Sequence, residues 1–217
     1  MGSRWTKVQE EEKRIIESNK RNLHYKSRLF GFLAGDGNVF IGKTKSNCHH
    51  TIRFFPDHDS LIGPFCESLY KVYGKIPSIK KLHNMYWIVL DSKIVVQDII
   101  KSASFGVKNW RMPYELFADR LCEAEWLRAF FDCEAYVSDS SIRIQTVNEA
   151  GTFQIKESLR KFGIESKQYL YHPKNKNWSN CHILVINNKN KTKYLSEIGF
   201  NHSVKLNKLV NTLKVYK

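Results

Sequence analysis

The sequence lacks the features that would insert the protein in a membrane or cross-link it. No apolar run approaches the roughly 20 residues of a membrane-spanning helix, and no amphipathic basic helix favours a membrane surface. The five cysteines are scattered and include no CxxC pair, so the pattern indicates neither a disulfide framework nor a zinc site. We therefore expect reduced thiols and an intracellular protein, in the cytoplasm or nucleoid or in an organelle.

Acidic residues are scarce relative to basic ones. The 217 residues include 35 Lys and Arg but only 21 Asp and Glu, which gives a net charge of +14. Apolar residues make up 42% of the chain, an ordinary globular composition that argues against disorder. A basic surplus of this size indicates a polyanionic partner, and nucleic acid is favoured over a membrane surface.

One pattern of elements occurs twice along the chain. Residues 1–26 are charged and predict a peripheral helix or arm. Residues 27–112 then predict helix, hairpin, helix, hairpin and helix, at 28–36, 39–43, 50–55, 59–73, 78–83, 85–90 and 93–102. Residues 113–217 repeat this order, at 116–134, 136–138, 142–147, 149–162, 167–172, 182–186 and 189–197, with a last helix at 202–215. We predict an α/β (α+β) fold made of two pseudo-symmetric αββαββα units.

Each unit begins with an apolar segment that ends in a carboxylate. Residues 29–37 read Leu-Phe-Gly-Phe-Leu-Ala-Gly-Asp-Gly, and residues 127–135 read Leu-Arg-Ala-Phe-Phe-Asp-Cys-Glu-Ala. The two acids are Asp36 and Glu134, at the same place in each unit. A negative charge at a helix C-terminus opposes the helix dipole. Because this arrangement occurs twice, it indicates a function for both acids.

Small residues share one face of each predicted helix. They are four residues apart, Gly31 and Gly35 in the first helix and Ala129 and Cys133 in the second. Small side chains let two helix backbones approach closely, so we expect these faces to pack together and the two helices to end side by side.

Helices packed in this way would bring the two carboxylates together. Adjacent carboxylates repel each other unless a cation lies between them. Hard oxygen ligands suit Mg²⁺, which can complete its shell with water and phosphate oxygens. Such an ion activates water for phosphodiester hydrolysis. The predicted metal site comprises Asp36 and Glu134 with the preceding residues Gly35 and Cys133.

The two segments resemble the signature of LAGLIDADG homing endonucleases, and two copies on one chain resemble the monomeric, pseudo-dimeric branch of that family. The resemblance extends over residues 27–215. It implies a saddle of two antiparallel sheets around a central pair of packed helices. It also implies a monomer that cuts a long double-stranded DNA target with Mg²⁺, for which Mn²⁺ or Ca²⁺ can substitute in binding. Ala135 departs from the family's usual Gly, and a left-handed turn there would cost about 1 kcal/mol.

Two alternatives remain open at the level of sequence. Some family members are RNA maturases that bind their host intron RNA, and a catalytically inactive DNA-binding relic would have the same fold. The retained acid pair favours nuclease chemistry.

The resemblance also suggests supporting residues. Lys93 and Lys189 each begin the helix after the fourth strand, where the family often has a basic residue near the scissile phosphates. Asn148 follows the second strand, where Gln or Asn often holds the water shell of the site. The first unit has Asp57 and Asp59 in that turn, and the sequence does not choose between them. Asp59 also suits an N-cap.

Asp132 precedes Glu134 by two residues and so points elsewhere on the helix. We interpret it as a capping or structural residue.

Alternation along the strands predicts a DNA-binding face on each sheet. Arg, Gln and Lys on a ribbon can read base edges in the major groove or contact phosphates. The predicted DNA-binding residues are Lys43, Thr51, Arg53, Lys80, His83, Arg143, Gln145, Lys167, Tyr169 and Tyr171.

Overall fold

The computed structural model describes residues 7, 10, 11, 13–15, 17, 21–43, 48–83, 85–175 and 177–214. The first unit contains α2 (Leu23–Ala34), β1 (Gly37–Lys43), β2 (Cys48–Phe54), η1 (Asp59–Leu61), α3 (Ile62–Tyr73), β3 (Ser78–Leu82), β4 (Met85–Asp91) and α4 (Lys93–Ser102). The second contains η2 (Tyr114–Leu116), α5 (Arg120–Glu134), β5 (Tyr136–Val137), β6 (Ser141–Thr146), α6 (Glu149–Lys161), β7 (Ser166–Tyr171), β8 (Cys181–Asn187), η3 (Asn188–Asn190), α7 (Lys191–Glu197) and α8 (Ser203–Lys214). The predicted αββαββα order is confirmed in both units.

The two sheets have the same topology. Their strand orders are β1-β2-β4-β3 and β5-β6-β8-β7, and all neighbouring strands are antiparallel. Arg53 pairs with Val89 in the first sheet, and Arg143 pairs with Val185 in the second. The equivalent register reflects the sequence repeat, because each unit spaces its apolar and polar residues in the same way.

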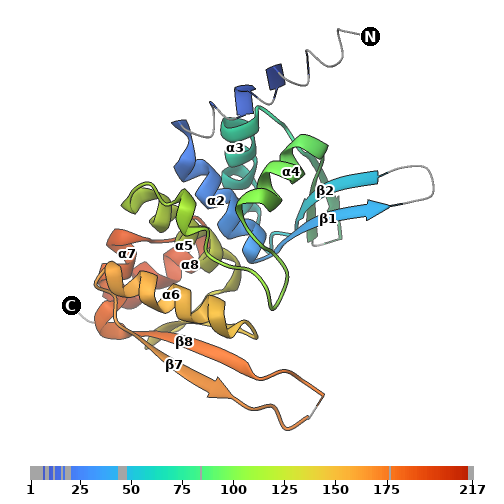
Figure 1. Ribbon diagram of the computed structural model, residues 1–217. Coiled ribbons are helices and arrows are strands. Elements are labelled where there is room, and N and C mark those ends of the chain that lie inside the picture. Colours follow the sequence, from blue (N-terminus) through green and yellow to red (C-terminus); the bar gives the residue numbers. More distant parts are fainter. Residues whose placement is uncertain are drawn as a thin grey trace.

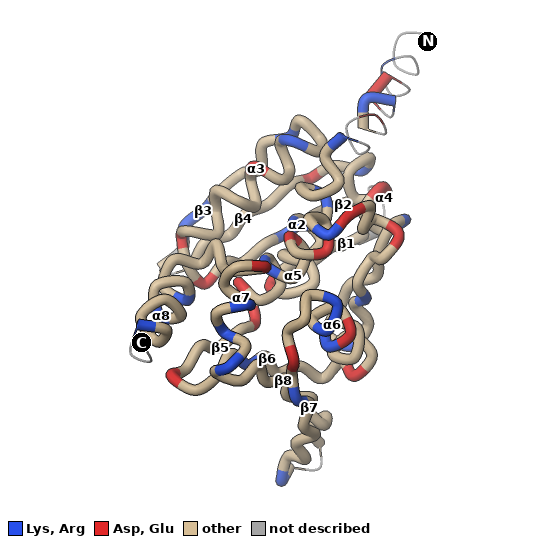
Figure 2. Tube along the Cα trace, turned by 90° about the vertical axis from the view of Figure 1, so that its left-hand side faces the viewer, with Lys and Arg blue, Asp and Glu red and all other residues tan. Residues whose placement is uncertain are grey.

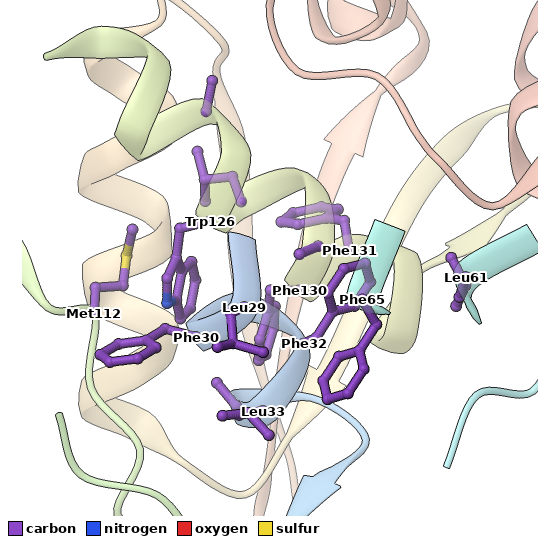
Figure 3. Close-up of a cluster of buried hydrophobic side chains, with 14 of the residues drawn as sticks. Leu29, Phe30, Phe32, Leu33, Leu61, Phe65, Met112, Trp126, Phe130 and Phe131 are labelled. Carbon is purple, nitrogen blue, oxygen red and sulfur yellow. The ribbon is translucent and has the colours of Figure 1, made fainter. Parts of the chain in front are cut away.

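The helices that begin the units, α2 and α5, lie side by side at the centre of the molecule, with the β1–β2 hairpin to one side and β7–β8 to the other (Figure 1). Their apolar side chains form the middle of the core (Figure 3), where Phe30 and Phe32 of α2 lie near Trp126 and Phe130 of α5. The Trp126 and Phe130 rings are stacked with centroids 5.1 Å apart. Burying a side chain of this size stabilises the fold by about 1.5–3 kcal/mol.

The ends of the two central helices differ from the sequence prediction. Helix α2 begins at Leu23, five residues before the predicted start at residue 28, and it ends at Ala34 because Gly35 leaves the helical region with ψ −100°. Asp36 therefore lies in a turn rather than at the end of the helix. Helix α5 begins at Arg120, where the Asp119 side chain caps the Cys122 amide. The predicted start at residue 116 falls instead on the short 3₁₀ turn η2.

The N-terminal segment is described only in part. Its described residues between 7 and 21 are helical. Ile15 is buried in the core, and Glu11 forms an ion pair with Lys75 at 2.6 Å. These residues pack against the first unit, while the rest of the predicted arm lies outside the described residues. The division into 1–26, 27–112 and 113–217 stays a prediction, and α2 crosses its first boundary.

Lysines and arginines occur on both units (Figure 2). Among the described helices, none has the length and apolarity needed to cross a bilayer.

Candidate functional site

Two glycines allow the close approach of the central helices. A Cβ added at Gly31 would lie 2.3 Å from the Trp126 carbonyl oxygen and 2.9 Å from the Ala129 Cβ. A Cβ at Gly35 would lie 2.5 Å from the Cys133 Cβ. Real Cβ atoms do not tolerate such contacts. The structure therefore brings together the four residues that the sequence assigns to the helix interface.

Asp36 and Glu134 come directly after two residues of this contact, Gly35 and Cys133. The Asp36 carbonyl oxygen accepts a hydrogen bond from the Phe55 amide at 3.2 Å, which fixes the turn to the end of β2. Glu134 is the last residue of α5. Ala135 has an extended backbone (φ −82°, ψ 139°), so the left-handed turn that would have made Ala costly is not formed.

The close contact of Gly35 with Cys133 brings near each other the two carboxylates that follow them in sequence, Asp36 and Glu134. The pKa of Glu134 is raised to about 7, first by burial and second by the negative charge of Asp36. Burial also raises the pKa of Asp36, with a second contribution from the charge of Asp57, while the Cys133 thiol lowers it by hydrogen bonding. The raised pKa values mean that both carboxylates are destabilised as anions and would gain from a cation.

Sequence reasoning missed Lys205, the lysine of this site. Its Nζ donates to the Asp132 carbonyl at 2.5 Å and to the Cys133 carbonyl at 3.0 Å, at the end of α5. Its positive charge lowers the pKa of both Asp36 and Glu134. Lys205 belongs to α8, about 70 residues after the motif, so no local spacing signals its position.

The sequence left open whether Asp57 or Asp59, both in the turn after β2, supports the site. Asp57 lies 3.4 Å from His202 Nε2, and its charge acts on Asp36. Asp59 instead lies beside His58, with its Oδ1 3.0 Å from the His58 Nδ1. The predicted capping by Asp59 is wrong, because the His58 Nδ1 accepts the hydrogen bond from the Ser60 amide. Asp57 is therefore the residue of this turn that faces the site.

Asp132 is fully buried and fastens the start of α8 to α5. Its carboxylate accepts hydrogen bonds from the Asn201 amide at 2.8 Å, the Asn201 side chain at 2.9 Å and the His202 amide at 2.9 Å. Burial nevertheless raises its pKa to about 6. These contacts give Asp132 a structural function that positions Lys205.

Three supporting residues of the sequence prediction lie elsewhere. Of the described side chains that shift the pKa of Asp36 or Glu134, none is Lys93 or Lys189. Lys93 is an exposed first residue of α4, and Lys189 forms an ion pair with Glu165. Each lies two residues after the end of the fourth strand of its unit, β4 or β8, whereas the lysine beside the acids, Lys205, comes from α8.

Asn148 is the third of these residues. It is buried, its Oδ1 caps the Gly151 amide at 2.9 Å, and its Nδ2 donates to the Trp110 carbonyl at 2.7 Å. The structure thus shows Asn148 as a helix cap, and its predicted contact with the water shell of the site stays a prediction.

Most of the predicted DNA-binding residues share the outer face of their sheet. Strand register puts Arg53 and Lys80 on one face of the first sheet. In the second sheet one face carries five of them: Arg143, Gln145, Lys167, Tyr169 and Tyr171. All seven are exposed. Arg53 lies over the Phe40 ring and Arg143 over the Tyr136 ring, so each face carries a matching cation–π pair.

The other three predicted DNA-binding residues, Thr51, His83 and Lys43, do not belong to this group of seven exposed side chains. Thr51 is buried, and its hydroxyl donates to Asp91 at 2.6 Å, so this part of the prediction is wrong. His83 is exposed in the β3–β4 turn with φ 53°, on the opposite parity to Lys80. Lys43 ends β1, and its side chain lies outside the described residues.

A cleft of about 500 Å³ adjoins Glu134. Its walls come from both units and include Gly35, Asn38, Gln145 and the loop around Gly106. Among the described residues no group of three or more His, Cys, Asp and Glu side chains could bind a metal ion by itself. A metal at Asp36 and Glu134 would therefore need further ligands from a substrate or from water.

Comparison with known proteins finds a family match in the second unit and a structural match over most of the chain. Residues 121–199 match a LAGLIDADG-like domain. The structure of the homing endonuclease I-DmoI in complex with DNA and Mn superposes with a TM-score of 0.64 at 16% identity, covering 81% of this chain and 96% of that one.

Two curated proteins of Methanocaldococcus jannaschii contain a similar segment. A replication factor C small subunit is 29% identical over 188 residues, which is 85% of this chain and 10% of that protein. A glutamine–fructose-6-phosphate aminotransferase is 25% identical over 217 residues, 90% of this chain and 19% of that protein. The chain thus spans a tenth to a fifth of the length of these relatives. The second unit thus matches a LAGLIDADG-like domain, and the chain as a whole has the two-unit fold of the homing endonuclease structure.

Proposed function

We propose that this protein is a site-specific endonuclease that binds double-stranded DNA and cuts both strands at its paired carboxylates. One observation carries the proposal: Asp36 and Glu134, from different units, meet at the end of a helix contact that only glycine permits. A merely structural interface would not hold two partly buried carboxylates next to each other, because each raises the free energy of ionising the other.

The residues present suit a divalent cation. The donors are carboxylate oxygens, which Mg²⁺ and Mn²⁺ prefer, and the related I-DmoI structure contains Mn together with DNA. When bound, such an ion would lower the pKa of a water molecule and stabilise the leaving oxygen of a phosphodiester. Asp36 and Glu134 would hold it, with the neighbouring backbone of Gly35 and Cys133 setting their positions.

Lys205, Asp57 and His202 would balance the charge of the site and hold its side chains in position. Lys205 is placed to neutralise negative charge that develops on a phosphate next to the acids, and its own position depends on the carbonyl oxygens at the end of α5. Asp57 is oriented by His202, whose Nδ1 accepts from the Lys205 amide at 3.4 Å. Asp57 would therefore add a negative charge on the Asp36 side of the site, next to the proposed cation.

The outer faces of the two sheets supply the DNA contacts. Each face carries an exposed arginine on its second strand, Arg53 or Arg143, with further cations and aromatic side chains beside it. Arginine on a two-stranded ribbon suits guanine edges in the major groove. Because one chain carries both faces, a monomer would cover both halves of a long target.

Similarity to the curated relatives supports the proposal that this chain acts as a self-contained module. A similar segment forms a small part of two proteins whose names describe unrelated chemistry. A segment that recurs in such different hosts is expected to have an activity of its own, as a site-specific endonuclease would.

The test is cleavage of a randomised duplex DNA library in Mg²⁺ by the native protein and by Glu134→Gln. We expect the native protein to cut both strands of one long site and the variant to bind that site without cutting it. Tight binding of the library without cleavage by either protein would overturn the nuclease proposal. Binding of intron RNA in preference to duplex DNA would point to the maturase alternative.

A further inference from the structure

The two units differ most in one connection. In the first unit, residues 83–84 join β3 to β4, whereas residues 172–180 join β7 to β8 in the second. Figure 1 shows the β7–β8 hairpin projecting away from the body of the protein. The second unit therefore carries an extended tip that its counterpart lacks, and we call residues 172–180 the β7–β8 tip.

Local hydrogen bonds join the described residues of this tip, 172–175 and 177–180. The Trp178 amide donates to the Asn175 carbonyl at 3.1 Å, and the Asn175 Oδ1 accepts from the Asn177 amide at 3.0 Å. His172 Nδ1 lies 3.1 Å from Asn180 Oδ1 and closes the base of the loop. A turn held in this way presents its side chains at a fixed place beyond the end of the sheet.

Trp178 is the prominent side chain of the tip. It is 70% exposed, and Tyr169 and Tyr171 on the adjoining strand are 52% and 49% exposed. Tryptophan is usually well covered in folded proteins. An indole left in water at the end of a projecting hairpin indicates a surface that another molecule covers.

The charge around the tip defines the chemistry of that molecule. The tip contains two lysines, Lys174 and Lys176, and no Asp or Glu. Lys167, Tyr169 and Tyr171 share the face that carries Arg143 and Gln145. The tip is thus continuous with the proposed DNA face. Cations interleaved with exposed aromatic rings favour nucleic acid over a protein surface.

We propose that the β7–β8 tip is an additional DNA contact, in which Trp178 packs against the sugars of the DNA backbone at one end of the target. This inference rests on the proposed DNA-binding function and adds that the footprint is asymmetric. Contacts with the sugar–phosphate backbone carry no direct sequence information. The tip would therefore lengthen the bound site on the side of the second unit without adding a strict sequence requirement there.

The experiment compares footprints of the native protein, Trp178→Ala, Trp178→Phe and Phe153→Ala on the duplex selected from the library, in Ca²⁺ to limit cleavage. Phe153 is 58% exposed on α6 and serves as the matched control. We expect Trp178→Ala to weaken binding by about tenfold and to lose protection at one end of the site. Trp178→Phe should retain most of both properties, and Phe153→Ala should match the native protein.

Two results would overturn the inference, and they are distinguishable. If Trp178→Ala has the native affinity and footprint, the tip does not contact DNA, while the proposed endonuclease function stands. If the native protein binds no duplex, the proposed function and the inference fail together. Because Trp178 is exposed, unchanged thermal unfolding of Trp178→Ala will exclude misfolding as the cause of a lost contact.

Discussion

At the scale of single residues, the site combines charges that are unfavourable when the protein is alone. Glu134 and Asp36 are both partly buried and have raised pKa values, while Lys205 supplies the compensating charge. The protein therefore bears a cost in folding stability for an arrangement that becomes favourable when a cation and a phosphate arrive. This cost has a definite dependence on pH.

The first prediction concerns stability in the absence of divalent cations. The pKa of Glu134 is about 7 in the folded protein against 4.5 for the free side chain, so the folded state binds the proton more tightly. The free energy of unfolding should be highest below pH 4.5 and fall as the pH rises to 7, by at most about 3 kcal/mol. The coupled pair shares this titration. Urea unfolding from pH 5 to pH 8 measures it.

Glu134→Gln is the matching variant for this prediction. It should lose most of the decrease in unfolding free energy between pH 5 and 8, whereas the decrease due to Asp132, with its pKa of about 6, should remain. Ca²⁺ should stabilise the native protein more at pH 8 than at pH 5. Identical pH profiles for the native protein and the variant would contradict the assignment.

The second prediction separates two lysines. Lys205→Met should reduce the cleavage rate about 100-fold and leave DNA affinity within a few fold, because Lys205 acts beside the acids. Lys189→Met, at the position favoured by the sequence, should cleave at nearly the native rate because Lys189 pairs with Glu165. Single-turnover cleavage measures both. A larger loss for Lys189→Met would restore the sequence prediction.

At the scale of elements, the packing of α2 on α5 determines where the acids lie. The third prediction is that Gly31→Ala destabilises the fold by about 3 kcal/mol or more, since its Cβ would meet a backbone oxygen that cannot move alone. Gly63→Ala is the control, because nothing lies within 4 Å of its Cβ in helix α3. It should stabilise the protein by up to about 1 kcal/mol. Equal effects in chemical denaturation would disprove the close-contact argument.

These elements were also the part of the protein that sequence patterns predicted best. The spacing of Gly31 and Gly35 indicated a helix contact because helical periodicity is a local property. Lys205 and Asp57 could not be assigned in the same way. Lys205 reaches the site only through the fold of the α7–α8 connection, and the choice of Asp57 over Asp59 depends on a contact with His202 of the other unit. Thr51 illustrates the reverse case, since alternation placed it correctly on the outer face but could not show that Asp91 covers it.

At the scale of the whole molecule, the two units are joined by charge as well as by apolar packing. Glu125 of α5 accepts hydrogen bonds from Arg28 of α2 at 2.6 Å and from Arg128 at 2.5 Å. Arg28 also pairs with Glu67 of α3 at 2.9 Å. The Glu125 side chain is only 5% exposed, so solvent screens this network weakly. The network lies at the start of the same helix pair whose other end holds the acids.

The last prediction tests whether this network joins the units. Glu125→Ala should destabilise the protein by about 3–5 kcal/mol, because it leaves two arginines without their shared carboxylate. Arg28→Ala should cost less, since Glu125 keeps Arg128. The double variant should be more stable than the sum of the two losses implies, by about 1 kcal/mol or more. Additive losses in urea unfolding would mean that Arg28 and Glu125 act independently and that apolar packing alone joins the units. A coupling energy measured in this cycle would instead explain how one chain keeps Asp36 and Glu134 in register across the interface.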